Sequence, residues 1–141
     1  MRSVYDAIKN VKAIDPVATS IARASASIDT QGYNSGVVVV VNGAATGAPT
    51  SYTVNAKVQD CATTDGSFAD ISGLVITEIV ANSKIATIRL EGLGGAGIKR
   101  FIKVVVTPAM TGGTSPKALI AATVQLGRAF KEPVGNSAAG A

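Results

Sequence analysis

Five consecutive valines at positions 37–41 constrain the fold of this chain more than any other feature. Valine is branched at Cβ, which lowers its helix propensity and suits the pleated surface of a sheet. A run without alternation is apolar on both faces, which is typical of a strand that is covered on both sides. The segment 36–42 therefore predicts a central strand, and we expect Val39 to lie in the core.

Four further segments alternate between apolar and polar residues, as expected of strands with one buried face. They cover residues 52–60, 84–91, 98–107 and 117–126. Because successive side chains of a strand point to opposite faces, one half of each segment must face inward. The predicted inward-facing side chains include Val58, Ile88, Ile102, Val104 and Val124.

Turn signals separate these segments. Asp65-Gly66 is a strong hairpin signal, and we expect a positive-φ turn there, after which Phe68 enters the core. About eight strands with regular turns between them, and no alternation with helices, predict an all-β fold. The expected architecture is an antiparallel β-sandwich that resembles a jelly roll.

The order and spacing of these pieces resemble small β-sandwich proteins from the structural gene clusters of tailed bacteriophages, over roughly residues 25–127. The resemblance implies a capsid decoration (cement) or minor head protein. Such a protein binds the outer surface of the major capsid protein lattice, often as a homotrimer, and stabilises the head. The implied location is the capsid surface of the virion, after synthesis in the host cytoplasm. The segments that carry the resemblance are 27–35, 36–42, Lys57-Val58-Gln59-Asp60, Asp65-Gly66-Ser67-Phe68-Ala69-Asp70-Ile71 and 99–107.

The two ends of the chain differ from its middle. We expect three regions: an N-terminal arm (1–24), the sandwich (25–127) and a flexible C-terminal tail (128–141). Pro16 stops any helix that begins before it, and the last residues contain little that could form a core. If this division is right, removing the arm leaves the sandwich folded.

The arm itself carries apolar residues at helical spacing, which predicts a short helix or an extended segment that lies on something else. A segment this short is weakly stable alone, so we expect a sibling subunit or the shell to order it. The predicted partner-binding residues are Val4, Tyr5, Ile8 and Val11.

Composition argues against an enzyme. The chain has no histidine, so the usual general base and the commonest metal ligand are missing. Cys61 is alone, and residues 92–97 match a dinucleotide motif only by letter because a strand follows them. Asp60, Asp65 and Asp70 do not have the spacing of a calcium loop. We therefore expect no catalytic, cofactor-binding or metal-binding residues.

Charge and hydropathy argue against two other partners, nucleic acid and a membrane. The net charge of +4 comes from 13 basic and 9 acidic residues that are spread along the chain, whereas nucleic-acid binding usually needs a basic stripe. Lys99, Arg100 and Lys103 form the densest cluster, which we interpret as a solvated strand end. No apolar run is long enough to cross a bilayer, and residues 1–6 lack the start of a signal peptide.

Two alternatives to a capsid decoration function stay open. One is a structural protein of the tail or of the head–tail junction. The other is a jelly-roll carbohydrate-binding module on the virion surface, which would need an exposed aromatic platform or a bound Ca²⁺. The chain has no tryptophan, and its few aromatic residues are needed in the core. The aromatic side chains of the sandwich are Tyr33, Tyr52, Phe68 and Phe101.

Overall fold

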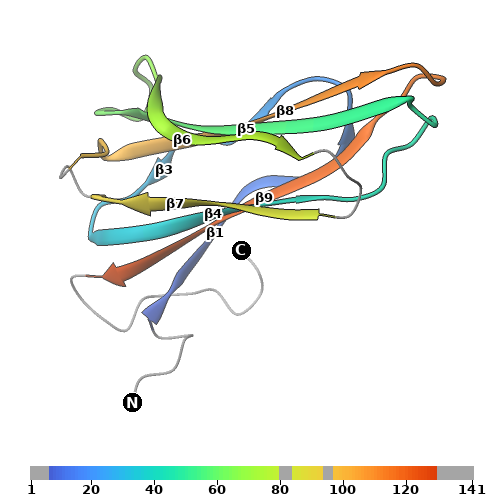
Figure 1. Ribbon diagram of the computed structural model, residues 1–141. Coiled ribbons are helices and arrows are strands. Elements are labelled where there is room, and N and C mark those ends of the chain that lie inside the picture. The colour runs from blue at the N-terminus through green and yellow to red at the C-terminus, as the bar shows by residue number, and fades with distance from the viewer. Residues whose placement is uncertain (1–6, 80–83, 94–96, 130–141) are drawn as a thin grey trace.

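The computed structural model describes residues 7–79, 84–93 and 97–129, and over these residues it confirms an antiparallel β-sandwich. Two sheets lie face to face (Figure 1). Sheet A has the strand order β1-β9-β4-β7, and sheet B has the order β2-β8-β5-β6, with β3 also paired to β8. The strands are β1 (Lys9–Thr19), β2 (Arg23–Ala24), β3 (Ile28–Asp29), β4 (Tyr33–Asn42), β5 (Ser51–Cys61), β6 (Ala69–Ile79), β7 (Lys84–Glu91), β8 (Phe101–Thr111) and β9 (Ala118–Ala129).

The topology is that of a jelly roll. Because β2 and β3 both pair with β8, they act as one interrupted strand, which leaves eight strands in two four-stranded sheets. The pairs β5·β6, β4·β7, β2/β3·β8 and β1·β9 are all antiparallel and are nested one inside the next around the turn after Cys61. Rolling up one long antiparallel ribbon in this way is what closes the two sheets on each other.

The core between the sheets is made of branched aliphatic side chains. Val38 and Val40 of sheet A and Val58 and Val104 of sheet B are fully buried. Each such side chain contributes about 1.5–3 kcal/mol by leaving water. The predicted burial of five side chains is confirmed: Val58, Ile88, Ile102, Val104 and Val124.

The prediction for Val39 is wrong by one residue. Val38 and Val40 are fully buried, and Val39 is only half-buried because its side chain points to the outer face of sheet A. The strand is central, as expected, with β7 on one side and β9 on the other. Its outer face, however, is not covered by another layer of the described chain.

A buried polar residue, Asn42, decides which alternate side chains of β4 point into the core. Asn42 has no exposed surface. Its Nδ2 donates to the Tyr52 hydroxyl at 3.3 Å, and its Oδ1 accepts from the Lys84 backbone N–H at 3.0 Å. These bonds tie the end of β4 to the facing sheet and to the start of β7, so the amide is satisfied although it is buried.

Of the two forms predicted for the N-terminal segment, residues 9–19 take the extended one as strand β1, and the short helix is wrong for them. Val11 and Val17 pack against the core, and Ile14 is buried within it. Pairing with β9 along this strand overrides the helical spacing, because it satisfies the free edge of sheet A. The predicted boundary after residue 24 therefore falls inside the sandwich, and residues 130–141 of the predicted tail lie outside the described residues.

The turn after Cys61 also differs from the prediction. Gly66 does not have a positive φ. A Cβ on it would lie 2.5 Å from Thr63 Oγ1 and 2.6 Å from Cys61 Sγ, so glycine is needed there for close approach. Phe68 is half-buried on the outer side of sheet B and is not part of the central core.

Within residues 7–79, 84–93 and 97–129, no helix is long and apolar enough to cross a bilayer.

Candidate interaction surface

The outer face of sheet A carries the largest group of exposed apolar side chains in the described structure. On β4 the outward-pointing residues are Val37, Val39 and Val41, and the last of these is 40% exposed. Val41 lies in register with Ile85 of β7, which is 70% exposed, and with Ala121 of β9. We call Val41, Ile85, Leu119 and Ala121 the apolar end of this face.

The other end of the same face is polar. Val37 lies between Arg89 of β7 and Gln125 of β9. Arg89 Nε is 2.8 Å from Glu91 Oε1, but both side chains are largely exposed, so the pair adds little stability. A groove of about 300 Å³ lies here. It is lined by Ile8, Ser35, Gly36, Val37, Arg89, Glu91, Gln125 and Gly127.

The predicted arm residues are not brought together. Ile8 lines this groove on the outer face of sheet A, whereas Val11 packs inward against the core. The reason is geometric: residues three apart share one face of a helix but lie on opposite faces of a strand. Val4 and Tyr5 lie outside the described residues. Of the four, Ile8 is therefore the residue that the described structure places on an outer surface.

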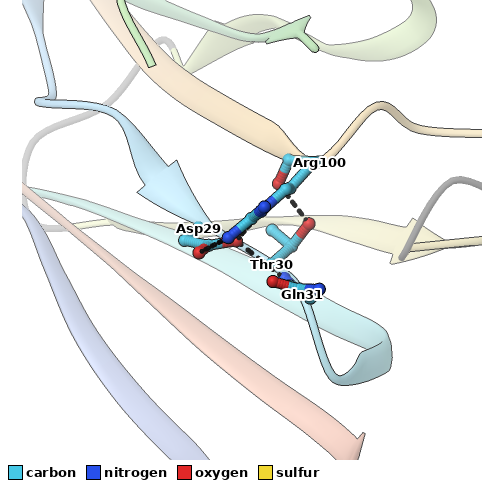
Figure 2. Close-up of polar contacts among 4 residues, drawn as sticks. All are labelled: Asp29, Thr30, Gln31 and Arg100. Carbon is cyan, nitrogen blue, oxygen red and sulfur yellow. Dashed lines mark hydrogen bonds and ion pairs between the residues drawn. The ribbon is translucent and has the colours of Figure 1, made fainter. Parts of the chain in front are cut away.

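In the basic cluster at the start of β8, Arg100 and Lys103 contact other residues of the same chain. Arg100 makes a bidentate ion pair with Asp29, with Nε–Oδ1 and Nη2–Oδ2 distances of 2.9 and 2.8 Å (Figure 2). Arg100 also lies over the Phe101 ring, and Lys103 lies over the Phe68 ring. These contacts agree with the interpretation of the cluster as a strand end.

Further hydrogen bonds surround the ion pair between Asp29 and Arg100. The Thr30 backbone N–H and its hydroxyl both donate to the Arg100 carbonyl oxygen, and the Gln31 N–H donates to Asp29 Oδ1 (Figure 2). The Arg100 hydrogen bonds, together with that from Gln31, hold the pKa of Asp29 below its ordinary value, against a smaller opposing effect of burial. The ion pair and these hydrogen bonds join the end of β3 to the start of β8.

Two of the three aspartates around the turn after Cys61, Asp60 and Asp70, have separate hydrogen-bond partners. Asp60 accepts from the Lys99 backbone N–H at 3.0 Å. Asp70 accepts from Gln59 and Lys57, and these bonds lower the pKa of Asp70. Within the described residues, no three Asp, Glu or Cys side chains gather as they would around a metal ion.

Cys61 is buried, and its sulfur lies 3.8 Å from the Thr63 hydroxyl. The Thr63 backbone hydrogen bond lowers the pKa of the Cys61 thiol. No histidine exists to act as its base, so the residue is best explained by packing beside Gly66.

Sequence reasoning missed the outer face of sheet A. One signal for it was available: in the alternating segment 84–91 the inward residues are Ala86, Ile88 and Leu90, and Ile85 is an apolar residue on the polar side. The valine run gave no comparable signal, because either phase of the strand looks equally apolar.

No protein-family model and no curated protein matches this chain. Among solved structures, a chain of the infectious bursal disease virus particle is similar, with a TM-score of 0.50 and 11% identity over 85% of this chain. This chain spans 31% of the length of that viral protein. At such low identity the likeness shows the β-sandwich fold alone.

Two further structures are similar at lower scores. The SPBc2 prophage-derived protein YomS has a TM-score of 0.48 and 9% identity, with 89% of this chain and 98% of that one covered. TmCBM61, solved with β-1,4-galactotriose, has a TM-score of 0.42 and 12% identity, with 90% and 86% covered.

Proposed function

We propose that the protein is a structural component of a tailed-phage virion that binds the major capsid protein lattice and decorates and stabilises the head. The observation that carries this proposal is the apolar end of the outer face of sheet A. Val41, Ile85 and Leu119 are 40%, 70% and 44% exposed on a regular sheet. Contiguous apolar side chains on a rigid surface are typical of a protein interface.

The energetics favour contact with a large, preformed partner. The side chains are held on paired strands, so little conformational entropy is lost when they are covered. Burying apolar surface contributes about 25 cal/mol per Å² before the costs of association. A lattice that offers many equivalent sites would therefore collect many copies, as a decoration protein requires.

The N-terminal residues extend the proposed contact. Ile8 lies in the groove at the polar end of the same face. We infer that Ile8, with Val4 and Tyr5, adds to the contact, and that Val11 does not because it faces the core.

The surface favours this role over carbohydrate binding. Sugar binding by a jelly roll usually uses an exposed aromatic ring, but the described aromatic side chains are half-buried at Tyr33, Tyr52 and Phe68 and buried at Phe101. A jelly roll by itself does not separate the two roles, because both viral capsid and lectin domains use it. Placement at the tail or head–tail junction is an outcome of the experiment below.

The experiment compares two lysine substitutions at similarly exposed valines on the two sheets. Val41→Lys changes the apolar end of sheet A, and Val75→Lys changes the outer face of sheet B, where Val75 is 49% exposed. Both are mixed with particles that lack this component, sedimented, and imaged by electron microscopy. We expect at least a tenfold loss of occupancy for Val41→Lys, since a charge in an apolar contact is costly, and wild-type occupancy for Val75→Lys.

Three results would contradict the proposal. Equal occupancy of both variants would mean that the outer face of sheet A is not the contact. Density confined to the tail or neck would assign the protein to that part of the virion. Binding to a galactoside column in place of particles would favour the carbohydrate-binding alternative. Thermal melting of each variant checks that the loss of occupancy is not a loss of fold.

A further inference from the structure

The two sheets have four edge strands, and they differ in how they are protected. An edge strand exposes unpaired backbone N–H and C=O groups that can accept another strand. Proteins block such edges with proline, bulges, glycine kinks or very short strands. Sheet A ends at β1 and β7, and sheet B ends at β2/β3 and β6.

Three of these edges carry a block. β1 contains Pro16 and two shifts of register against β9. β6 has two shifts against β5 and a left-handed Gly73, with φ of +82°. β2 and β3 are two residues each and are separated by a break in the ladder. Each device interrupts the regular row of donors and acceptors that a further strand would need.

The fourth edge, β7, has no such interruption of its backbone; its charged residues are Lys84, Arg89 and Glu91. It pairs with β4 in unbroken register over all eight residues, from Asn42↔Lys84 to Ser35↔Glu91. It contains neither proline nor glycine. Among the described strands, none pairs with its other side. Its outward row of backbone groups is therefore regular and long enough to accept a strand of equal length.

The charges at the ends of β7 favour a second copy of the same strand. Lys84 begins the strand and Glu91 ends it. An antiparallel copy brings the Lys84 end of one strand near the Glu91 end of the other, whereas a parallel copy would bring like charges together. A second copy is also already folded as a strand, so pairing does not require a disordered segment to become ordered.

The outward side chains favour one register over that with Arg89 on the axis. With Thr87 on the two-fold axis, Thr87 faces its own copy and Arg89 faces Ile85 of the other strand. The methylene stem of arginine can cover apolar surface, which would bury Ile85, the most exposed large apolar side chain described. Moving the axis to Arg89 would set the two guanidinium groups directly opposite each other, which is unfavourable.

We propose that the free edge of β7 is a self-association site, at which a second copy of this chain adds its own β7 antiparallel with Thr87 on the axis. The result is one continuous eight-stranded sheet across two copies. A single strand pair is a small interface, so the dimer dissociates on dilution. This inference does not depend on the capsid, because it concerns the protein in solution.

The test is sedimentation velocity of the full chain over a range of concentrations, without particles. We expect wild type to dimerise reversibly. Thr87→Lys places two ammonium groups opposite each other and should weaken dimerisation roughly tenfold or more. The matched control is Thr123→Lys, which adds the same charge to the same face but on the inner strand β9, where Thr123 is also exposed. This control should dimerise like wild type.

A covalent test guards against a folding defect. Thr87→Cys should form a disulfide-linked dimer on mild oxidation, because directly opposed residues of antiparallel strands approach closely enough. Thr123→Cys should not, and Cys61 is buried in both proteins. Wild type that stays monomeric at every concentration, or Thr87→Lys that dimerises as well as wild type, would overturn the proposal. Particle binding by monomeric Thr87→Lys would leave the proposed function standing.

Discussion

The outer faces of the two sheets are built on the same core but are completed differently. On sheet B, Asp70 is bonded to Lys57 and Gln59, and Lys103 lies over the Phe68 ring. On sheet A, Val41 and Ile85 are exposed and have no covering layer in the described chain. Several polar groups on sheet B thus find partners within the chain. Sheet B exposes one large apolar side chain among its described residues, Val75, whereas sheet A exposes a group of three, Val41, Ile85 and Leu119, that only a contact from outside can bury.

The largest expected effect comes from the core that both faces share. Val104 is fully buried on β8, between β2/β3 and β5. Val104→Asp should abolish folding, because an unpaired carboxylate in the core costs several kcal/mol. Circular dichroism and thermal melting measure the outcome. A soluble Val104→Asp protein with a cooperative transition would show that the core is assigned incorrectly.

The next largest effect concerns the contribution of β1 to the stability of the sandwich. Deleting residues 1–19 removes the buried Ile14 and uncovers the edge of β9. We expect a loss of several kcal/mol in the free energy of unfolding, since one large buried side chain alone contributes about 1.5–3 kcal/mol. Urea denaturation measures it, and a deletion of residues 1–6, which keeps β1, is the control. Unchanged stability of the longer deletion would restore the arm as a separate unit.

A smaller effect locates the boundary between the core and the outer face within one strand. Val38→Ala removes a fully buried side chain and should cost about 2 kcal/mol. Val39→Ala, one residue along, removes a half-buried one and should cost clearly less. The two variants differ only in position, so each controls for the other in urea denaturation. The reverse order would show that the outer face of sheet A is the covered one.

The smallest effect tests the internal pairing at the edge of sheet B. Because its bonds to Arg100 lower the folded-state pKa of Asp29, the ion pair stabilises the fold above the unfolded-state pKa of about 3.9. This contribution is lost as pH falls through the folded-state pKa. Asp29→Asn should therefore be less stable than wild type at pH 7, by up to about 1 kcal/mol for so exposed a pair, and equal to it in strong acid.

Thermal melting at a series of pH values gives that comparison. Asp15→Asn is a suitable control, because Asp15 forms a more exposed pair with Lys12. A difference between Asp29→Asn and wild type that does not change with pH would assign the role of Asp29 to packing or to its bond with Gln31.

The sequence was sufficient for those parts of the fold where one face is polar. The segment 84–91 was predicted with the bounds of β7, and Val58 and Val104 were assigned to the core correctly. Where both faces are apolar, as in the valine run, the sequence pattern does not show which side chains point into the core. There the choice depended on the contacts of Asn42 with Tyr52 and Lys84, which lie on other strands and leave no trace in the alternation of the valine run itself.

The N-terminal stretch and the candidate surface were beyond prediction for a different reason. β1 is a strand because β9 offers it an edge, and the paired residues lie between 99 (Thr19 and Ala118) and 117 (Lys9 and Leu126) positions apart in the sequence. The apolar end of the outer face of sheet A consists of side chains from β4, β7 and β9, none of which has a recognisable motif of its own. Only the register of the three strands brings Val41, Ile85 and Ala121 into one row.

The nesting of the strand pairs around the turn after Cys61 has a consequence for how the molecule folds. The innermost pair, β5·β6, closes a short loop, whereas β1·β9 joins the two ends of the chain. Closing a longer loop costs more entropy and takes longer. We expect the ribbon to zip from the turn outward, with β1 the last strand to dock. A newly made chain would therefore expose the edge of β9 for part of its folding time, and an unpaired strand edge is a site at which another chain can pair.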